Sequence, residues 1–348
     1  MMMMMTTGAR GARASGARER ETTRSLREQY ALALESSEGA ASRRTTIGMT
    51  YGGGTYVAAW RLGGRTLRGV VDTGSPFLTT PRACTEEWAP MGCVDASDVS
   101  FEAFEATRER YGLQIDDSTR WFAGRTASVG DWTFEELVFG VTSDVRGANA
   151  APFVGLVKYV DRERGIRPSF LQQTDIESFA LDFDDSRLTL SRDSLIDPSD
   201  SGVLRTVDLR ERGAPVYHYA SPCDELWING ERFHTSKPIY VVFDSGTTGM
   251  LVDRALFEAS DFHLGTYQTH MKFTDTNGRV KYCGSSLKTC TKDCLFIVSP
   301  IDVPWPGCGK DYHVVFAGLS VLRKEGALTI DAERGLVRLG RFTSSLEA

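Results

Sequence analysis

The sequence carries one short signature twice, in the same order and at similar spacing. The signature consists of two apolar residues, an aspartate, a hydroxyl residue, a glycine and another hydroxyl residue, at positions 70–75 and 242–247. An apolar segment with a glycine follows each copy, with Gly155 83 residues after Asp72 and Gly318 74 residues after Asp244. Such internal similarity is typical of a repeated architecture. It predicts that the chain folds as two copies of one unit.

A third pair of segments extends the repeat and indicates where its halves begin and end. Residues 181–188 are similar to residues 328–339 and occur last in each half. Between the halves lies a stretch rich in Asp, Ser, Pro and Gly, which is typical of a connector. We therefore expect a leader over residues 1–45, an N-terminal lobe with Asp72 over 46–190, a connector over 191–204 and a C-terminal lobe with Asp244 over 205–348.

The local pattern from Thr46 onward is typical of β-structure. Residues 56–62 and 66–71 are strand-like and are joined by Gly63-Gly64, a hairpin signal. Residues 121–122 and 133–141 are further predicted strands, and residues 254–260 are the best helical segment. Many short strands separated by glycine predict an all-β fold with few short helices.

Composition excludes several classes of protein. The 348 residues are 41% hydrophobic and carry a net charge of −6, which is ordinary for a globular protein and argues against a nucleic-acid partner. No run reaches the roughly 18 apolar residues of a membrane span. The five histidines lack the HExxH spacing of a zinc protease, and no GxSxG motif is present. We therefore expect no metal and no cofactor.

The two Asp-Thr/Ser-Gly-Ser/Thr motifs with their downstream apolar-Gly segments resemble those of the pepsin-like aspartic peptidases. The resemblance spans residues 46–342. It implies a bilobal acid-protease fold, in which two pseudo-twofold-related β lobes flank a central cleft and bring Asp72 and Asp244 together. Two carboxyl groups about 3 Å apart cannot both be ionised, so such a pair shares one proton. The ionised group would act as general base on a water molecule, and the protonated one would donate to the scissile carbonyl. The expected function is that of a monomeric endopeptidase acting on peptides or proteins.

The same resemblance assigns roles to the neighbours of the two aspartates. The hydroxyls of Ser75 and Thr247 are expected to bond the outer carboxylate oxygens, while Thr73 and Ser245 brace the two turns against each other. The remaining members of the expected site are the motif glycines, Gly74 and Gly246, and the two downstream glycines, Gly155 and Gly318. The downstream glycines resemble those at which a strand passes behind the active-site loop; the alternative is that they lie in ordinary core turns.

A flap over the cleft is a further implication of the resemblance. The family usually carries Tyr-Gly near the flap tip, which here corresponds to Tyr111-Gly112, with Trp121 as the alternative tip residue. Two departures affect this expectation. Residues 113–117 replace the usual Gly-rich continuation, and Thr79 stands where the family often has a tryptophan that supports the flap.

Seven cysteines leave at least one unpaired within the chain. Cys84 and Cys93 resemble the family's small disulfide loop after the first motif. A bridge among the late cysteines would resemble the family's second-lobe disulfide, with Cys283, Cys290, Cys294 and Cys308 as the candidates. The alternative is that all seven are buried free thiols.

The leader has no acidic residue before Glu19 but contains Arg10, Arg13 and Arg18. This Arg-rich, hydroxyl-rich composition is typical of a transit peptide for a plastid or mitochondrion. The alternatives are a disordered leader, a propeptide remnant, or a secretory or vacuolar protein whose start is wrongly assigned.

The rival function is that of a catalytically inactive, peptide-binding module with the same fold. Inactive relatives usually lose one aspartate or its neighbours, and both motifs are intact here. A dimeric retroviral-type protease is a further alternative, but its chains supply one aspartate each, whereas this chain holds two.

Overall fold

A computed structural model describes residues 42–81, 89–94, 119–122, 126–135, 137–142, 152–160, 168–260, 262, 268–286 and 298–340. Residues 43–348 make up one compact unit. The predicted leader lies almost wholly outside the described residues. Strands dominate the described part, whose only α-helices are α2 (Arg254–Ala259) and α3 (Leu319–Leu322). The all-β prediction is therefore confirmed.

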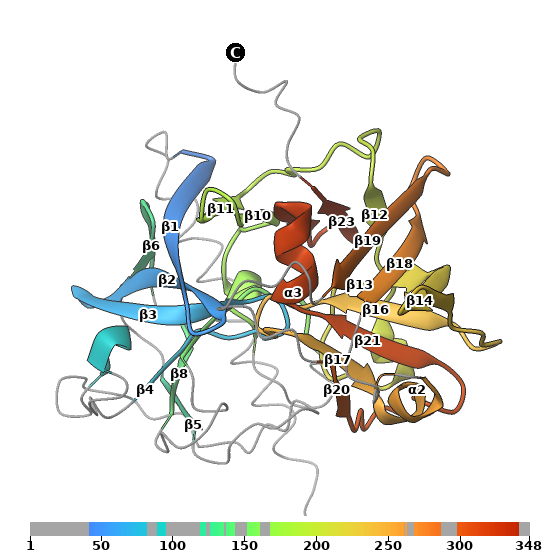
Figure 1. Cartoon of the computed structure of the whole chain (residues 1–348). Helices are drawn as coiled ribbons and strands as arrows, with labels where there is room; N and C mark the ends of the chain where they lie inside the picture. Colours follow the sequence, from blue (N-terminus) through green and yellow to red (C-terminus); the bar gives the residue numbers. More distant parts are fainter. Residues whose placement is uncertain are drawn as a thin grey trace, which may run out of the picture. The chain divides into compact units, whose positions relative to one another are not determined.

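The described strands form four sheets (Figure 1). The largest contains, in order of pairing, β12 (Val203–Arg205), β23 (Leu336–Leu339), β22 (Ala327–Asp331), β10 (Ser178–Asp182), β11 (Arg187–Ser191), β1 (Arg44–Gly52), β2 (Thr55–Leu62), β3 (Arg65–Asp72) and β9 (Phe153–Gly155), with β6 (Ala127–Val129) and β7 (Trp132–Phe134) attached beside β2.

The three smaller sheets hold the remaining described strands. One sheet contains, in order, β13 (Ala220–Cys223), β16 (Ile239–Phe243), β21 (His313–Ala317), β17 (Met250–Asp253) and β20 (Val298–Ile301). Another contains β15 (Glu231–Arg232), β14 (Glu225–Ile228), β18 (Gln268–Thr274) and β19 (Val280–Ser286). The last contains β4 (Thr79–Pro81), β8 (Phe139–Thr142) and β5 (Thr119–Phe122).

The largest sheet joins equivalent elements of the two sequence halves. At its centre β10 runs antiparallel to β22, with Ala180 opposite Thr329. Outward from this pair, β11 and then β1 follow on one side, and β23 and then β12 follow on the other. All these neighbours are antiparallel, so the first two strands on each side of the β10–β22 pair have the same order and direction, whereas β2, β3 and β9 continue the sheet beyond β1 only. The late segments that are similar in sequence thus meet in one sheet.

Each motif aspartate lies at the end of a buried strand. Strand β3 leaves a hairpin whose turn residues Gly63 and Gly64 have φ of 53° and 87°, a left-handed geometry that glycine adopts without strain. It then pairs in parallel with β9, placing Asp72 opposite Gly155. In the second half β16 pairs in parallel with β21, and Asp244 follows directly after β16. The same strand arrangement therefore delivers both aspartates.

The predicted strand over residues 133–141 is wrong as a single element. Strand β7 ends at Phe134 and β8 begins only at Phe139. The side chain of Gln173 holds the break: it accepts from Val138 N at 2.7 Å and donates to Val138 O at 3.2 Å. A side chain thus satisfies the backbone groups that a ladder would otherwise pair. The helix predicted at 254–260 is confirmed as α2, capped by Asp253, which accepts from Leu256 N at 3.0 Å.

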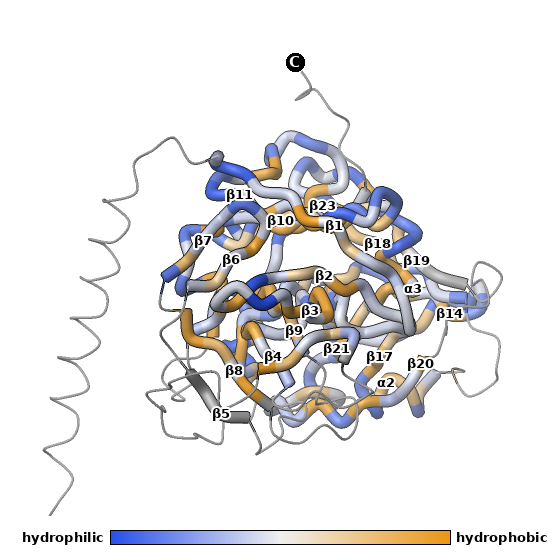
Figure 2. The backbone as a smooth tube through the Cα atoms, turned by 90° about the vertical axis from the view of Figure 1, so that its left-hand side faces the viewer, coloured by the Kyte–Doolittle hydropathy of each residue, from blue (hydrophilic) through white to orange (hydrophobic). Residues whose placement is uncertain are grey.

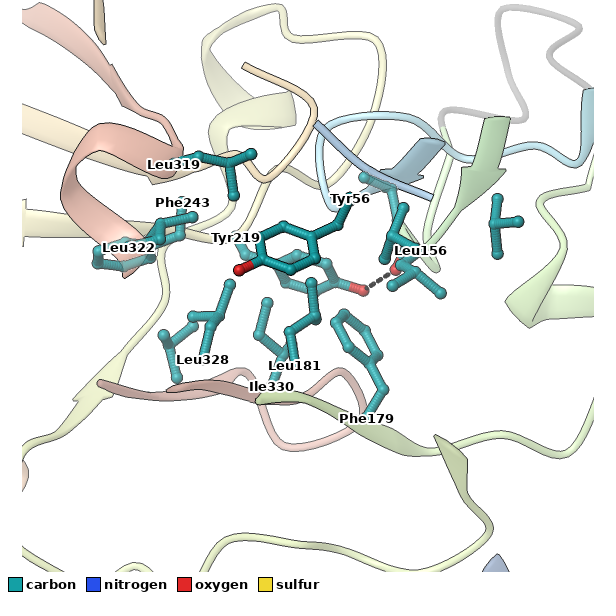
Figure 3. Close-up of a cluster of buried hydrophobic side chains, with 14 of the residues drawn as sticks. Tyr56, Leu156, Phe179, Leu181, Tyr219, Phe243, Leu319, Leu322, Leu328 and Ile330 are labelled. Atoms are coloured by element: carbon teal, nitrogen blue, oxygen red, sulfur yellow. Dashed lines mark hydrogen bonds between the residues drawn. The ribbon is translucent and has the colours of Figure 1, made fainter. Parts of the chain in front are cut away.

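A large apolar cluster lies between the central β10–β22 pair and the strands that carry the aspartates (Figure 3). Leu181 and Ile330 enter it from β10 and β22, and Phe243 enters it at the end of β16. Figure 2 shows apolar stretches along the strands and hydrophilic residues at many of the turns. In the part of the chain that the structure describes, no helix combines the length and apolarity needed to cross a membrane.

One buried histidine makes stability depend on pH. His218 packs against Trp305 and Phe316, and burial lowers its pKa from 6.5 to about 4. The unfolded chain therefore binds more protons than the folded chain between these two pH values. The contribution of His218 to the free energy of unfolding should therefore fall by up to about 3 kcal/mol as the pH drops from 6.5 to 4.

The variant His218→Phe should remove this dependence. Chemical unfolding at several pH values between 4 and 7 measures it, and the difference between variant and wild type isolates His218 from the carboxyl groups. Parallel curves for the two proteins would contradict the assignment.

Candidate functional site

Two aspartates from the two halves of the chain meet in the interior. Asp72 is 6% exposed and Asp244 is 9% exposed. The carboxyl group of Asp72 lies close enough to that of Asp244 for its negative charge to raise the pKa of Asp244. Two buried carboxyl groups at such close range are favourable neighbours when one of them carries a proton. The structure therefore brings together the two residues that the sequence singled out as catalytic.

The environment of this pair favours the protonated form of Asp244. Burial is the largest cause that raises the pKa of Asp244 well above its usual range, and the charge of Asp72 is the second. Hydrogen bonds from Thr247 and Gly246 act in the opposite direction, but they do not offset burial.

Each carboxylate is held by its own turn in the same way. Gly74 N donates to Asp72 Oδ1 at 2.7 Å, and Gly246 N donates to Asp244 Oδ1 at 2.9 Å. The hydroxyls of the third residues after the aspartates reach the other oxygens: Ser75 Oγ lies 2.5 Å from Asp72 Oδ2, and Thr247 Oγ1 lies 2.8 Å from Asp244 Oδ2. The geometry expected for Ser75 and Thr247 is therefore present.

The second residues of the two motifs bond the two turns to each other. Thr73 Oγ1 donates to Phe243 O at 2.7 Å and accepts from Ser245 N at 2.9 Å. Reciprocally, Ser245 Oγ donates to Val71 O at 2.7 Å and accepts from Thr73 N at 3.1 Å. Both side chains are fully buried. These four bonds, which we call the motif lock, fix the separation of the two aspartates.

The motif glycines allow the carboxyl groups to approach the opposite turn. A Cβ atom on Gly74 would lie 2.8 Å from Asp244 Oδ1, and one on Gly246 would collide with the carboxyl group of Asp72. Any side chain at these positions would therefore displace the partner aspartate. The glycines are required by the contact itself.

The downstream glycines lie behind the two turns, as the resemblance implied. Gly155 N donates to Phe77 O at 2.9 Å, and Gly318 N donates to Gly249 O at 3.1 Å. A Cβ atom on Gly155 would collide with Phe77 N, and one on Gly318 would collide with Thr247 O. The alternative of ordinary core turns does not explain this backbone contact.

The flap expectations are only partly described. Tyr111 and Gly112 lie outside the described residues, so their role stays a prediction. The alternative tip residue, Trp121, lies inside β5 opposite Gly140 of β8, which is a paired strand position and not a turn. Thr79 is buried in β4 and its Oγ1 accepts from Phe153 N at 2.8 Å, so its side chain joins β4 to the start of β9 in the largest sheet.

The cysteine predictions have mixed outcomes. Cys93 is buried and disulfide-bonded, while Cys84 lies outside the described residues, so their pairing stays a prediction. Cys223, Cys283 and Cys308 are free. A second bridge that uses Cys283 or Cys308 is therefore wrong. Strand β19 directs Cys283 into the apolar core opposite Met271, and Cys308 lies in the turn before β21.

Sequence reasoning missed a pair of buried tyrosines beside the site. Tyr56 precedes the residue opposite Val70, and Tyr219 precedes the residue opposite Val242, so both occupy the same register relative to their aspartates. Their hydroxyls make different contacts: Tyr56 donates to Phe183 O and Tyr219 donates to Leu156 O. Extending the alignment of the halves upstream of the motifs could have found this pair.

Neither of two comparisons with known proteins assigns a family to this chain. The scan of family models gave no match, and the search of curated proteins gave none either. Among the described side chains, no group of three or more His, Cys, Asp or Glu residues is placed to hold a metal ion.

The motif lock can be tested by removing one hydroxyl. Thr73→Ala leaves Phe243 O and Ser245 N without a buried partner, and each loss costs about 1–3 kcal/mol. We expect a fall of about 3 kcal/mol in the free energy of unfolding, measured by chemical denaturation. Thr73→Ser keeps the hydroxyl and serves as the control, with a much smaller loss expected. Equal losses in both variants would indicate that the methyl group, not the lock, stabilises this position.

Proposed function

We propose that the protein is an aspartic endopeptidase of the pepsin-like class, which hydrolyses peptide bonds with a water molecule activated between Asp72 and Asp244. The observation that carries this proposal is the close approach of these two buried carboxyl groups, each packed against the motif glycine of the opposite turn. Like-charged groups are normally kept apart, and a buried pair that shares a proton is typical of acid–base catalysis.

The reaction follows from the charges of the pair. In the singly protonated pair one carboxyl group carries the proton and the other is ionised, because burial and the neighbouring charge raise the pKa of Asp244 and disfavour a second ionisation. The carboxylate removes a proton from the water as the water attacks the peptide carbonyl, and the protonated partner donates to the carbonyl oxygen. As the C–N bond breaks, the carboxyl group that took the proton from water passes it to the leaving amine, and a hydroxyl of the tetrahedral intermediate returns a proton to the other carboxylate, which restores the singly protonated pair. No covalent intermediate between enzyme and substrate is needed.

The proposed fold is the bilobal acid-protease fold, with each sequence half forming one lobe. Its support is the symmetric strand order around β10 and β22, together with the equivalent delivery of the aspartates by β3 and β16. A pseudo-twofold relation of this kind would bring two identical turns face to face. The proposed substrate is a peptide or protein that lies across the pair, and the proposed enzyme is a monomer.

Replacing either aspartate tests this function directly. Asp72→Asn and Asp244→Asn each remove one carboxyl of the pair, so the shared proton and the general base are lost. We expect cleavage of a mixed peptide library to fall by at least about a thousandfold in each variant. Asp302→Asn, which changes an exposed aspartate in an ion pair with Arg254, should retain activity.

Two outcomes would reject the enzyme. Turnover retained in either pair variant would refute the role of that aspartate. A folded wild-type chain that cleaves nothing between about pH 3 and pH 6 but binds peptides would favour the inactive binding module.

The pH dependence provides a separate test. Asp244 must hold its proton for catalysis, and the proton is lost as the pH rises through its raised pKa. We expect kcat/KM to be highest in acid and to fall as the pH rises past neutrality, because the second carboxyl then ionises. Initial rates on one peptide measure this, with circular dichroism at each pH to verify that the chain stays folded. A flat profile from about pH 4 to pH 8 would contradict the shared proton.

A further inference from the structure

Residues 155–158, which we call the backing segment, lie directly behind the turn that holds Asp72. Three consecutive amide groups of the segment donate to this turn. Gly155 N reaches Phe77 O at 2.9 Å, Leu156 N reaches Asp72 O at 2.8 Å, and Val157 N reaches Ser75 O at 3.0 Å. The position of Asp72 therefore depends on the position of the backing segment.

Tyr219, from the second half of the sequence, holds the backing segment in place. Its hydroxyl donates to Leu156 O at 2.7 Å (Figure 3). The same hydroxyl accepts from Lys158 N at 3.1 Å. Its side chain is fully buried, so no water competes for these bonds. Its carbonyl oxygen accepts from Phe243 N at 3.0 Å, one residue before Asp244. One residue thus contacts the supports of both aspartates.

The second half braces its own turn in a different way. After Gly318 the chain enters helix α3, and Leu319 N donates to Thr247 O at 2.8 Å. Residues 156–159 form no helix. Tyr56 has the register of Tyr219 in the first half, but its hydroxyl donates to Phe183 O at 2.9 Å, in the turn between β10 and β11. We call the two bonds between the Tyr219 hydroxyl and the backing segment the tyrosine clamp. This clamp is specific to the turn of Asp72.

The far end of the backing segment is also tied to the second half. The Nζ of buried Lys158 donates to Ile176 O at 2.9 Å and to the carboxylate of Glu333 in the turn between β22 and β23. Tyr159 donates to the same carboxylate. These contacts continue the clamp from the interior to a partly exposed residue.

We propose that Tyr219 is a positioning residue of the aspartate pair, which keeps Asp72 in contact with Asp244 by clamping the backing segment to the second half. The inference rests on the proposed peptidase function, because its consequence is catalytic. Removing the hydroxyl leaves Leu156 O and Lys158 N without this partner. The backing segment can then move away from Tyr219, which is itself bonded to Phe243 beside Asp244. Small displacements of catalytic groups are costly to the chemical step, even when substrate binding is unchanged.

The test compares Tyr219→Phe with the matched control Tyr56→Phe in the full chain. Both variants remove one buried hydroxyl from equivalent positions, but Tyr219→Phe leaves two backbone groups without this partner and Tyr56→Phe leaves one, so Tyr219→Phe should lose somewhat more stability. Only Tyr219→Phe should lower kcat, by about tenfold, with KM within about twofold of wild type. It should also move the alkaline limb of the pH profile to lower pH, because a more distant Asp72 raises the pKa of Asp244 less.

Amide hydrogen exchange gives a readout that does not need activity. The Leu156 and Val157 amides should exchange faster in Tyr219→Phe than in Tyr56→Phe or wild type. Glu333→Gln, at a partly exposed position, weakens the other end of the clamp and should cause smaller changes in the same direction. This variant decides the question if Tyr219→Phe does not fold.

The outcomes separate the inference from the function on which it rests. Superimposable kinetics, pH profiles and exchange in the two tyrosine variants would overturn the positioning role, whatever their stability. A folded but inert wild type would refute the peptidase function. Exchange at Leu156 would then decide the clamp alone: unchanged exchange overturns it, and faster exchange only in Tyr219→Phe supports it.

Discussion

The contact between two buried carboxyl groups is the constraint on which the surrounding structure depends. Such a contact is unfavourable unless one group is protonated and the backbones around both are fixed. The four bonds of Thr73 and Ser245 fix the two turns, and the missing side chains of Gly74 and Gly246 leave room for the carboxyl groups. The strands behind the turns then act as supports, through backbone contacts that a side chain at Gly155 or Gly318 would prevent. The proposed catalysis depends on the contact between the two carboxyl groups, and that contact requires the two turns to be held tightly.

Acidic conditions act on this protein in two opposite directions. The raised pKa of Asp244 means that the folded chain binds a proton that the unfolded chain has released, so this group favours the folded state less as the pH rises. His218 is kept neutral by burial, so it opposes folding as the pH falls towards 4. Between about pH 4 and 6.5 the two effects on the free energy of unfolding oppose each other, and above this range only the effect of Asp244 remains, so stability falls as the pH rises further.

The sequence predicted which residues meet at the site better than it predicted their surroundings. Asp72, Asp244 and their motif neighbours were found because the chain repeats them, and a repeat encodes a symmetric contact directly. The hairpin at Gly63-Gly64 and the capped helix after Asp253 were found from local signals. The break between β7 and β8 was missed, because it depends on Gln173, which is distant in sequence. The free states of Cys283 and Cys308 and the clamp of Tyr219 were missed for the same reason: they are set by tertiary packing, which no local pattern records.

The central claim, one proton shared by two aspartates, is tested most directly by carboxyl carbon NMR of the folded chain labelled at aspartate. The account predicts that one buried aspartate carboxyl group stays protonated at pH values well above those at which a carboxyl group usually titrates. It also predicts that Asp72→Asn shifts this titration towards lower pH, because the neighbouring charge is removed. Ordinary, independent titration of both Asp72 and Asp244, unchanged by substitution of the other, would contradict the account.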